Sequence, residues 1–199
     1  MSWYFDQTRA TQAAAFVVKC SGSKRMAYLK LLKLLYFADR ESLRENGYPI
    51  TGDQAFAMKR GPVLSTIYDC ITSDQFVEHD IWDRFFCTVG FDVQLKEDPG
   101  TGKLSRCDKR TLKNIYEIHK DLDGFDLSEL SHLLPEFVTT NEARIRRNHG
   151  SEIIPIQETL RALGFSPEEI ADIQERMEDE RCYFQFFEDN TSALNSSAR

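Results

Sequence analysis

The chain has 199 residues, of which 41% are hydrophobic and 29% charged, and this composition and length suit one globular domain with a terminal extension. No apolar run approaches the ~20 residues that a membrane-spanning helix requires. The formal net charge of −7 excludes a general positive field for nucleic acid. Five scattered cysteines and an N-terminus without a secretory pattern favour reduced thiols in the cytoplasm over a disulfide framework.

The negative charge is concentrated near the C-terminus. Residues Glu168 to Asp189 contain nine acidic residues and two arginines, which equals the net charge of the whole chain. Two interpretations are open, a solvated helix face or an acidic docking surface.

The N-terminal half is organised around one apolar helix. Thr8 to Cys20 is expected to form a first helix, with small alanines that allow close approach to a neighbour. Leucines and aromatics from Leu31 to Phe37 cover most of the circumference of a second helix, which predicts that it is central and buried. Ser23 is a candidate N-cap for this helix, and Asn46-Gly47 is a candidate C-terminal cap.

A short strand and a cationic turn follow the central helix. Ala55 to Met58 is an apolar run of strand length. Lys59-Arg60-Gly61-Pro62 ends it, and Pro62 is expected to be the first residue of a helix from Val63 to Ile71.

The middle of the chain mixes helix and strand signals. Phe76 to Phe85 is ambiguous, with Trp82 and Phe85 on one face if the segment is helical. Phe86 to Leu95 favours a strand with a bulge at Gly90. A return strand is expected at Leu104 and Ser105, in a small antiparallel sheet with Ala55 to Met58.

Helices are expected to dominate the remainder. Asp108 is a candidate cap for a helix from Lys109 to Lys120, and Asp126 with Glu129 fits a capping box for a helix from Leu127 to Leu134. The inward positions of the first of these helices are predicted to be Leu112, Ile115, Tyr116 and Ile118. Ile156 to Leu163 is expected to form a helix capped by Gly164, and Ser166-Pro167 begins an acidic helix to about Phe187.

These elements predict a mainly α protein with a small antiparallel β-sheet (α+β), compact around the buried central helix. The expected organisation is a domain over residues 1–165, an acidic C-terminal helix over 166–188 and a flexible tail over 189–199.

Two separated phrases resemble a known family. The string KLLYFADRES…GYPITGDQAFAMKRGPVLSTIYD, from Lys33 to Asp69, is similar to the Panacea domain, also called the SocA-like antitoxin domain. A second phrase, LSELSHLLPEF from Leu127 to Phe137, resembles a later segment of that family, with Phe137 where tryptophan is common. The resemblance covers roughly Ala13 to Leu163 and implies a protein that binds and neutralises a cognate toxin.

The residue patterns give no positive support to an enzyme, a metal site or a cofactor. Four histidines lie far apart, outside zinc-ligand spacings. His132 is best explained as a packed histidine bonded to backbone. No serine or cysteine lies in a nucleophile motif.

The leading hypothesis is therefore an interaction protein. It blocks a toxin encoded by a neighbouring gene, either by occluding the toxin's active surface or by delivering the toxin to a protease. Two interpretations of the cationic turn Lys59-Arg60-Gly61-Pro62 are open. Gly61 and Pro62 can set the geometry of the chain, which is a structural role, or the turn can display Lys59 and Arg60 for binding, which is a functional role. The candidate partner-binding residues are Lys59, Arg60, Gly61, Pro62, Tyr68, Tyr183, Phe184 and Phe187.

The alternative hypothesis is a regulatory or nucleic-acid-binding module. It would use the basic cluster from Arg144 to Arg147, although the balanced charge of the domain makes nucleic acid a less favoured partner.

Overall fold

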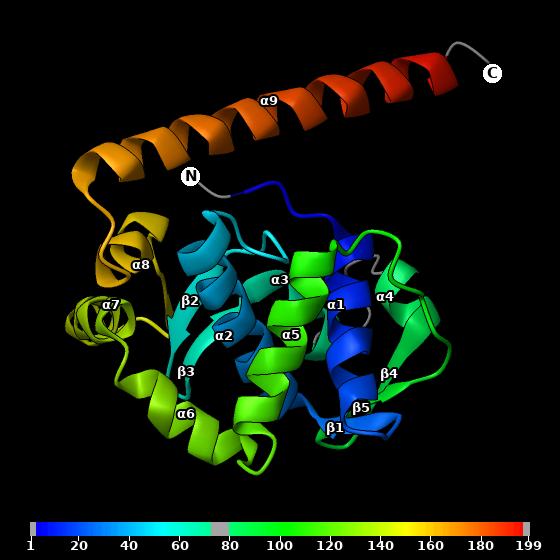
Figure 1. The fold of residues 1–199 in the computed structure, drawn as a ribbon, viewed down its shortest axis with the longest axis horizontal. Coiled ribbons are helices and arrows are strands. Elements are labelled where there is room, and N and C mark those ends of the chain that lie inside the picture. The colour runs from blue at the N-terminus through cyan, green and yellow to red at the C-terminus, as the bar shows by residue number, and fades with distance from the viewer. Residues whose placement is uncertain (1–2, 73–79, 197–199) are drawn as a thin grey trace.

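The computed structural model describes residues 3–72 and 80–196, and within these ranges helices surround two small antiparallel sheets (Figure 1). The helices are α1 (Gln7–Cys20), α2 (Tyr28–Asn46), α3 (Ser65–Thr72), α4 (Asp80–Phe85), α5 (Arg106–His119), α6 (Gly124–His132), α7 (Pro135–Arg146), α8 (Ile156–Ala162) and α9 (Pro167–Ser196). The strands are β1 (Arg25–Ala27), β2 (Ala55–Met58), β3 (Gly61–Leu64), β4 (Phe86–Val89), β5 (Asp92–Leu95) and β6 (Ser151–Ile153). The predicted fold class is confirmed.

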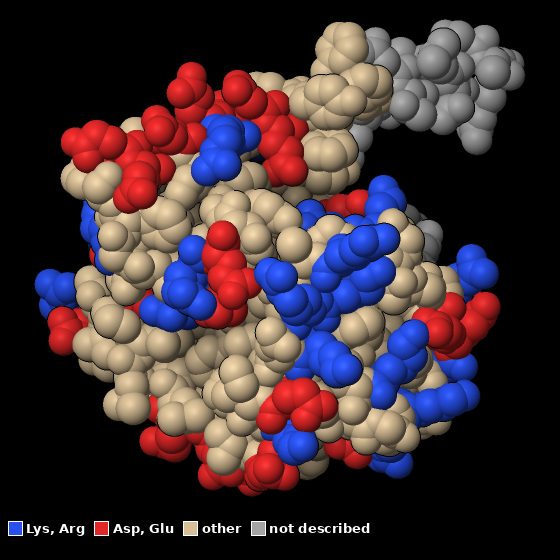
Figure 2. Space-filling view, in the orientation of Figure 1, with Lys and Arg blue, Asp and Glu red and all other residues tan. Residues whose placement is uncertain are grey.

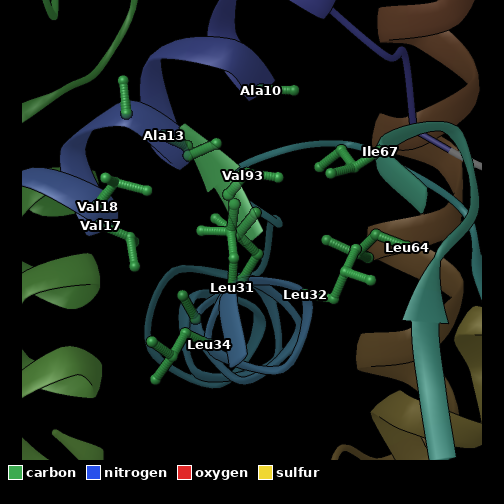
Figure 3. Packing of buried hydrophobic residues seen from close by; sticks show 14 of the residues in the cluster. Ala10, Ala13, Val17, Val18, Leu31, Leu32, Leu34, Leu64, Ile67 and Val93 are labelled. Carbon is green, nitrogen blue, oxygen red and sulfur yellow. The ribbon is translucent and has the colours of Figure 1, made fainter. Parts of the chain in front are cut away.

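Helix α2 is the centre of the main hydrophobic core, as predicted. Leu31, Leu32, Leu34 and Leu35 are all fully buried, and α1, α5 and α6 pack around the helix. Figure 3 shows Leu31 directed towards α1 and Val93 of β5, and Leu32 directed towards Leu64 of β3. The helix ends at Gly47, whose φ of 71° and whose amide bond to the Leu43 carbonyl (2.9 Å) confirm the predicted cap.

Truncation of one of these leucines gives a direct test of the core. Leu35→Ala removes three carbon atoms from a fully buried site, so we expect a loss of about 2–5 kcal/mol in the free energy of unfolding. Chemical denaturation measures this loss, and an unchanged midpoint would contradict the burial of Leu35.

The start of α2 differs from the prediction. Ser23 does not cap it; the Ser23 hydroxyl accepts a bond from the Arg25 amide (3.0 Å) before strand β1. Helix α2 begins only at Tyr28, because residues 25–27 pair with β5 instead of extending the helix. Helix α1 nevertheless packs on α2, as expected, and its small Ala10, Ala13 and Ala14 are buried.

The segment predicted as one bulged strand is a hairpin. Strands β4 and β5 pair from Phe86↔Leu95 to Val89↔Asp92, and Gly90, with a φ of 64°, lies in the turn between them. The sheet order is β1-β5-β4. The preceding helix α4 buries Trp82, whereas residues 76–79 of the ambiguous segment lie outside the described residues.

The second sheet has the order β3-β2-β6, so the predicted return strand at Leu104 and Ser105 is wrong. Ser105 is instead the N-cap of α5: its hydroxyl accepts from the Asp108 amide (3.0 Å), and the Asp108 carboxylate accepts from the Ser105 amide (2.8 Å). Asp108 is therefore the third helical residue and not the cap.

Two further helix predictions need correction. Asp123, and not Asp126, caps α6, because Asp126 is the partner in its capping box. Ile118 was predicted to face inward on α5 but is 70% exposed, while Leu112 and Ile115 are buried as expected.

Helix α9 starts at Pro167 behind a Ser166–Glu169 capping box, as predicted, and continues to Ser196, beyond the expected end near Phe187. It contacts the body through Ile170, Ile173 and Met177, which form a second cluster with Leu43 and Leu160. Its C-terminal half extends past the rest of the molecule (Figure 1). Among the described residues, no helix is long and apolar enough to cross a bilayer.

Candidate functional site at the β2–β3 turn

Lys59 and Arg60 form a two-residue turn between β2 and β3, and both side chains are exposed. The helix predicted from Val63 to Ile71 is present as α3, but its predicted start is wrong, because Gly61–Leu64 is strand β3 and α3 begins only at Ser65.

Pro62 is tolerated in the strand for a geometric reason. Met58↔Gly61 closes the turn, so the next pair, Ala57↔Pro62, is the kind in which no hydrogen bonds are exchanged between the strands. Strand β3 is also an edge strand, where a missing amide costs least.

Gly61 is the point where three distant segments meet. Its φ of +88° lies in the region that side-chain-bearing residues rarely adopt. A Cβ at this position would overlap the hydroxyl of Ser131 and would lie 2.8 Å from Lys33 Nζ and 3.3 Å from His132 Cδ2. The absence of a side chain therefore allows α2, α6 and the turn to pack against one another.

Lys33 anchors the turn to the central helix α2. Its side chain is fully buried on α2, and its ammonium group donates to the Pro62 carbonyl (2.7 Å). Burial lowers the pKa of Lys33 to about 7, because a charged amine is poorly solvated in the core. This hydrogen bond holds the hairpin against the central helix.

The depressed pKa predicts a pH dependence of stability. Between pH ~7 and ~10.5 the unfolded chain keeps a proton on Lys33 that the folded chain has released, so stability rises with pH in this window. We expect the wild type to gain up to about 1.4 kcal/mol per pH unit relative to Lys33→Met. Urea titrations of both proteins at pH 7.5 and 9.5 measure the free energy of unfolding. The same change between the two pH values in both proteins would contradict the prediction.

Ser131 and His132 complete the anchor from α6. Ser131 is fully buried and donates to the Ser128 carbonyl (2.7 Å). The His132 ring stacks on Phe137, with 5.0 Å between centroids and 13° between planes. His132 is packed as predicted, but its buried Nε2 has no hydrogen-bond partner among the described residues, so the expected backbone bond is not formed.

A buried carboxylate joins α2 to α7 beside this anchor. Glu136, in the first turn of α7, accepts from the Tyr36 hydroxyl (3.1 Å) and from Arg40 Nε (2.7 Å). Lys33, Tyr36 and Arg40 share α2, so one helix fixes both the hairpin and the start of α7. Sequence reasoning missed these roles, although a single lysine among buried leucines was a usable signal.

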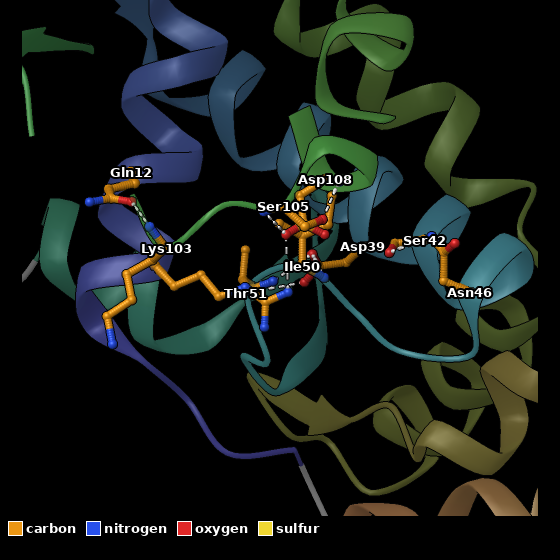
Figure 4. Close-up of polar contacts among 10 residues, drawn as sticks. Gln12, Asp39, Ser42, Asn46, Ile50, Thr51, Lys103, Ser105 and Asp108 are labelled. Atoms are coloured by element: carbon orange, nitrogen blue, oxygen red, sulfur yellow. Dashed lines mark hydrogen bonds and ion pairs between the residues drawn. The ribbon is translucent and has the colours of Figure 1, made fainter. Parts of the chain in front are cut away.

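A second set of hydrogen bonds, centred on Asp39, fixes the segment between α2 and β2. The Asp39 carboxylate accepts from the amides of Ile50 (3.0 Å) and Thr51 (2.9 Å) and from the Thr51 hydroxyl. Figure 4 shows Asp39 directed from α2 at Ile50 and Thr51. Burial raises the pKa of Asp39 to about 7. The chain leading into β2 is therefore held by hydrogen bonds.

The other predicted partner-binding residues lie elsewhere. Tyr68 is half-buried against the main core. Tyr183 and Phe187 are 60% and 49% exposed on α9, whereas the Phe184 ring stacks on Tyr4 at 4.3 Å. Figure 1 shows α6 and α9 on opposite sides of the body, so the turn and the α9 aromatics are two separate surfaces.

The basic cluster predicted at the end of α7 is largely engaged internally. Arg144 bonds the Asn141 side chain (2.9 Å) and the His149 carbonyl (3.0 Å), and Arg147 pairs with Glu152 (2.6 Å).

Exposed positive charge gathers instead over α5, below the acidic α9 (Figure 2). Its cations follow helical spacing: Arg106, Lys109, Arg110 and Lys113. Only Arg110 has an ion-pair partner among the described residues, Glu45 at 3.7 Å.

The described residues contain no group of three or more histidine, cysteine or acidic side chains arranged to hold a metal. No disulfide bond joins any of the five cysteines in the part of the chain that the structure describes.

Comparison with known families identifies the chain. A family model described as "Antitoxin SocA-like, Panacea domain" matches residues 31–136. No curated protein and no solved structure shows significant similarity. The matched region contains Lys33, Gly61, Ser131 and His132, so the buried anchor and the turn lie within it. The chain therefore belongs to the family of SocA-like antitoxins with a Panacea domain.

Proposed function

We propose that this protein is an antitoxin that neutralises a cognate toxin by direct binding through the Lys59–Arg60 turn. The observation that carries the proposal is the buried anchor. Lys33, Gly61 and Ser131 come from three segments of the family-matched region and together fix one turn that displays two cations. An anchor of this kind is suited to presenting a contact surface.

Preorganisation gives the turn an advantage in binding. The backbone at Gly61 and Pro62 is held by core contacts, so docking need not order it. Exposed charges at such a site accelerate association with a partner of opposite charge. Membership of an antitoxin-like family accords with binding rather than catalysis.

Co-expression tests the proposal. The adjacent reading frame is expressed under an inducible promoter with and without this protein, and growth is recorded. We expect the adjacent product alone to stop growth and co-expression to restore it. Growth arrest that persists in the presence of folded, expressed antitoxin would contradict the proposal.

The same assay separates the two modes of neutralisation. Occlusion of the toxin's active surface protects without changing toxin abundance. Delivery to a protease lowers toxin abundance, and protection is then lost in protease-deficient cells. Immunoblots of the toxin in both hosts distinguish these outcomes.

Nucleic-acid binding is a second candidate, favoured only by the basic face of α5 and not by the engaged arginines of α7. The net charge of −7 opposes it. Fluorescence anisotropy with duplex DNA at several salt concentrations tests it, since phosphate contacts give steep salt dependence. The absence of binding near physiological salt would remove this candidate.

A further inference from the structure

The outer face of α6 is unusually apolar for a surface helix. Phe125 is 62% exposed, Leu130 40% and Leu133, at the C-cap, 76%. The opposite side of the helix is buried through Leu127, Ser128 and Ser131. Three exposed apolar side chains on one short helix are typical of a contact surface, whereas single exposed hydrophobics need no explanation.

This face, which we call the α6 patch (Phe125, Leu130 and Leu133), is continuous with the cationic turn. The Arg60 guanidinium lies over the Phe125 ring, 5.4 Å from its centroid. Helix α6 also packs directly on β3, the strand that follows the turn. The turn and the α6 patch therefore form one surface with a cationic end and an apolar end.

We infer that the α6 patch binds the same toxin as the Lys59–Arg60 turn, and that the toxin presents apolar side chains beside a carboxylate. The inference rests on the proposed function and adds the location and chemistry of the main contact. A few residues supply most of the binding energy at a protein interface, and arginine is enriched among them, while aromatic residues in general are enriched at interfaces. The guanidinium of Arg60, which lies over the Phe125 ring, can donate its N–H groups to a carboxylate, while Phe125 and Leu133 offer apolar area.

The charges around the patch orient the partner. Lys59 and Arg60 lie at one end, whereas the Glu129 side chain, 83% exposed on α6, lies within the patch region. A carboxylate of the toxin is therefore expected at the turn, and apolar groups over Leu133.

The extent of the family match favours the toxin as the occupant. Residues 31–136 include the turn and all of the α6 patch, whereas Tyr183 and Phe187 of α9 lie outside it. A surface that lies within the family-matched region is a better candidate for toxin binding than a surface outside it. The competing occupant of the α6 patch is a second copy of this chain, and the test below distinguishes this dimer from the complex with the toxin.

The test measures binding to the purified product of the adjacent reading frame. The variant Phe125→Ser with Leu133→Ser is compared with a matched control, Phe91→Ser with Ile118→Ser, whose side chains are 79% and 70% exposed on other elements. Because the removed contacts are apolar, we expect at least about a tenfold loss of affinity in the first variant, mainly in the dissociation rate, and less than about twofold in the control.

A photo-crosslinking residue at position 125 gives an independent readout, with position 91 as its control. We expect covalent capture of the toxin from position 125 only. This measurement does not depend on the stability of the serine variant.

The outcomes separate the two proposals. Wild-type protein that neither binds the adjacent product nor protects cells overturns the proposed function, and the inference falls with it. Normal binding by the Phe125→Ser/Leu133→Ser variant, while Lys59→Glu with Arg60→Glu weakens binding, overturns the inference alone. Conversion of a wild-type dimer to a monomer in that variant, with toxin binding intact, assigns the α6 patch to self-association and also overturns it.

Discussion

Gly61→Ala is expected to lower the free energy of unfolding by about 2–5 kcal/mol, the sum of a backbone term and a packing term. The φ of +88° disfavours any residue with a Cβ. The added methyl group also overlaps Ser131 and lies 2.8 Å from the Lys33 ammonium group. Both neighbours are fully buried, so the core around them has to accommodate any shift of their side chains.

Gly90→Ala is the matched control. Gly90 has a φ of +64° but no atom within 4 Å of an added Cβ, so only the backbone cost of about 1–2 kcal/mol remains. Denaturant unfolding of both variants measures the difference between them. Equal losses at the two positions would show that the contacts of Gly61 with Lys33 and Ser131 carry no energetic weight.

The elements that the sequence predicted well are those specified by local signals. The apolar circumference of α2, the glycine that ends it and the serine–proline start of α9 each lie within a few neighbouring residues. The conformational preferences of these residues depend on their sequence neighbours and not on the rest of the fold.

The errors fall where tertiary pairing overrides a local preference. Pro62 fits the first turn of a helix, but β3 pairs with β2, whose other edge pairs with β6. Strand β6 has only three residues, Ser151–Ile153, and carries no strong strand pattern. Without that partner the sheet, and the position of Pro62 on its edge, could not be predicted.

The candidate site was predicted only in its exposed part. Lys59 and Arg60 were identified because these two cations directly precede Gly61-Pro62, a pair that indicates a fixed turn. The anchor beneath them joins residues that are about 30 and 70 positions from Gly61 in the sequence, Lys33 and Ser131. Contacts at this separation depend on the packing of α2 against α6, which no local pattern encodes.

Lys59→Glu combined with Arg60→Glu is expected to abolish protection against the toxin while leaving the melting curve unchanged. Both side chains are exposed, and the geometry of the turn depends on Gly61 and Lys33 and not on them. Reversing two charges replaces attraction to an acidic partner with repulsion, which costs several kcal/mol when like charges are juxtaposed.

The matched control is Arg106→Glu with Lys113→Glu, which makes the same change in net charge on the exposed face of α5. We expect this variant to protect cells fully, because its charges lie on α5 and not in the β2–β3 turn. Co-expression growth, pull-down of the toxin and thermal melting are measured on both variants. Protection by the turn variant at native stability would remove the turn from the interface, and would leave the α6 patch or the α9 aromatics from Tyr183 to Phe187 as the contact with the toxin. Loss of protection in both variants would show that the overall charge of the protein, and not the turn, governs recognition.

Unfolding of the turn variant alone would assign Lys59 and Arg60 a structural role. The anchor formed by Lys33, Gly61 and Ser131 would then stabilise the fold and would not serve to display a binding surface.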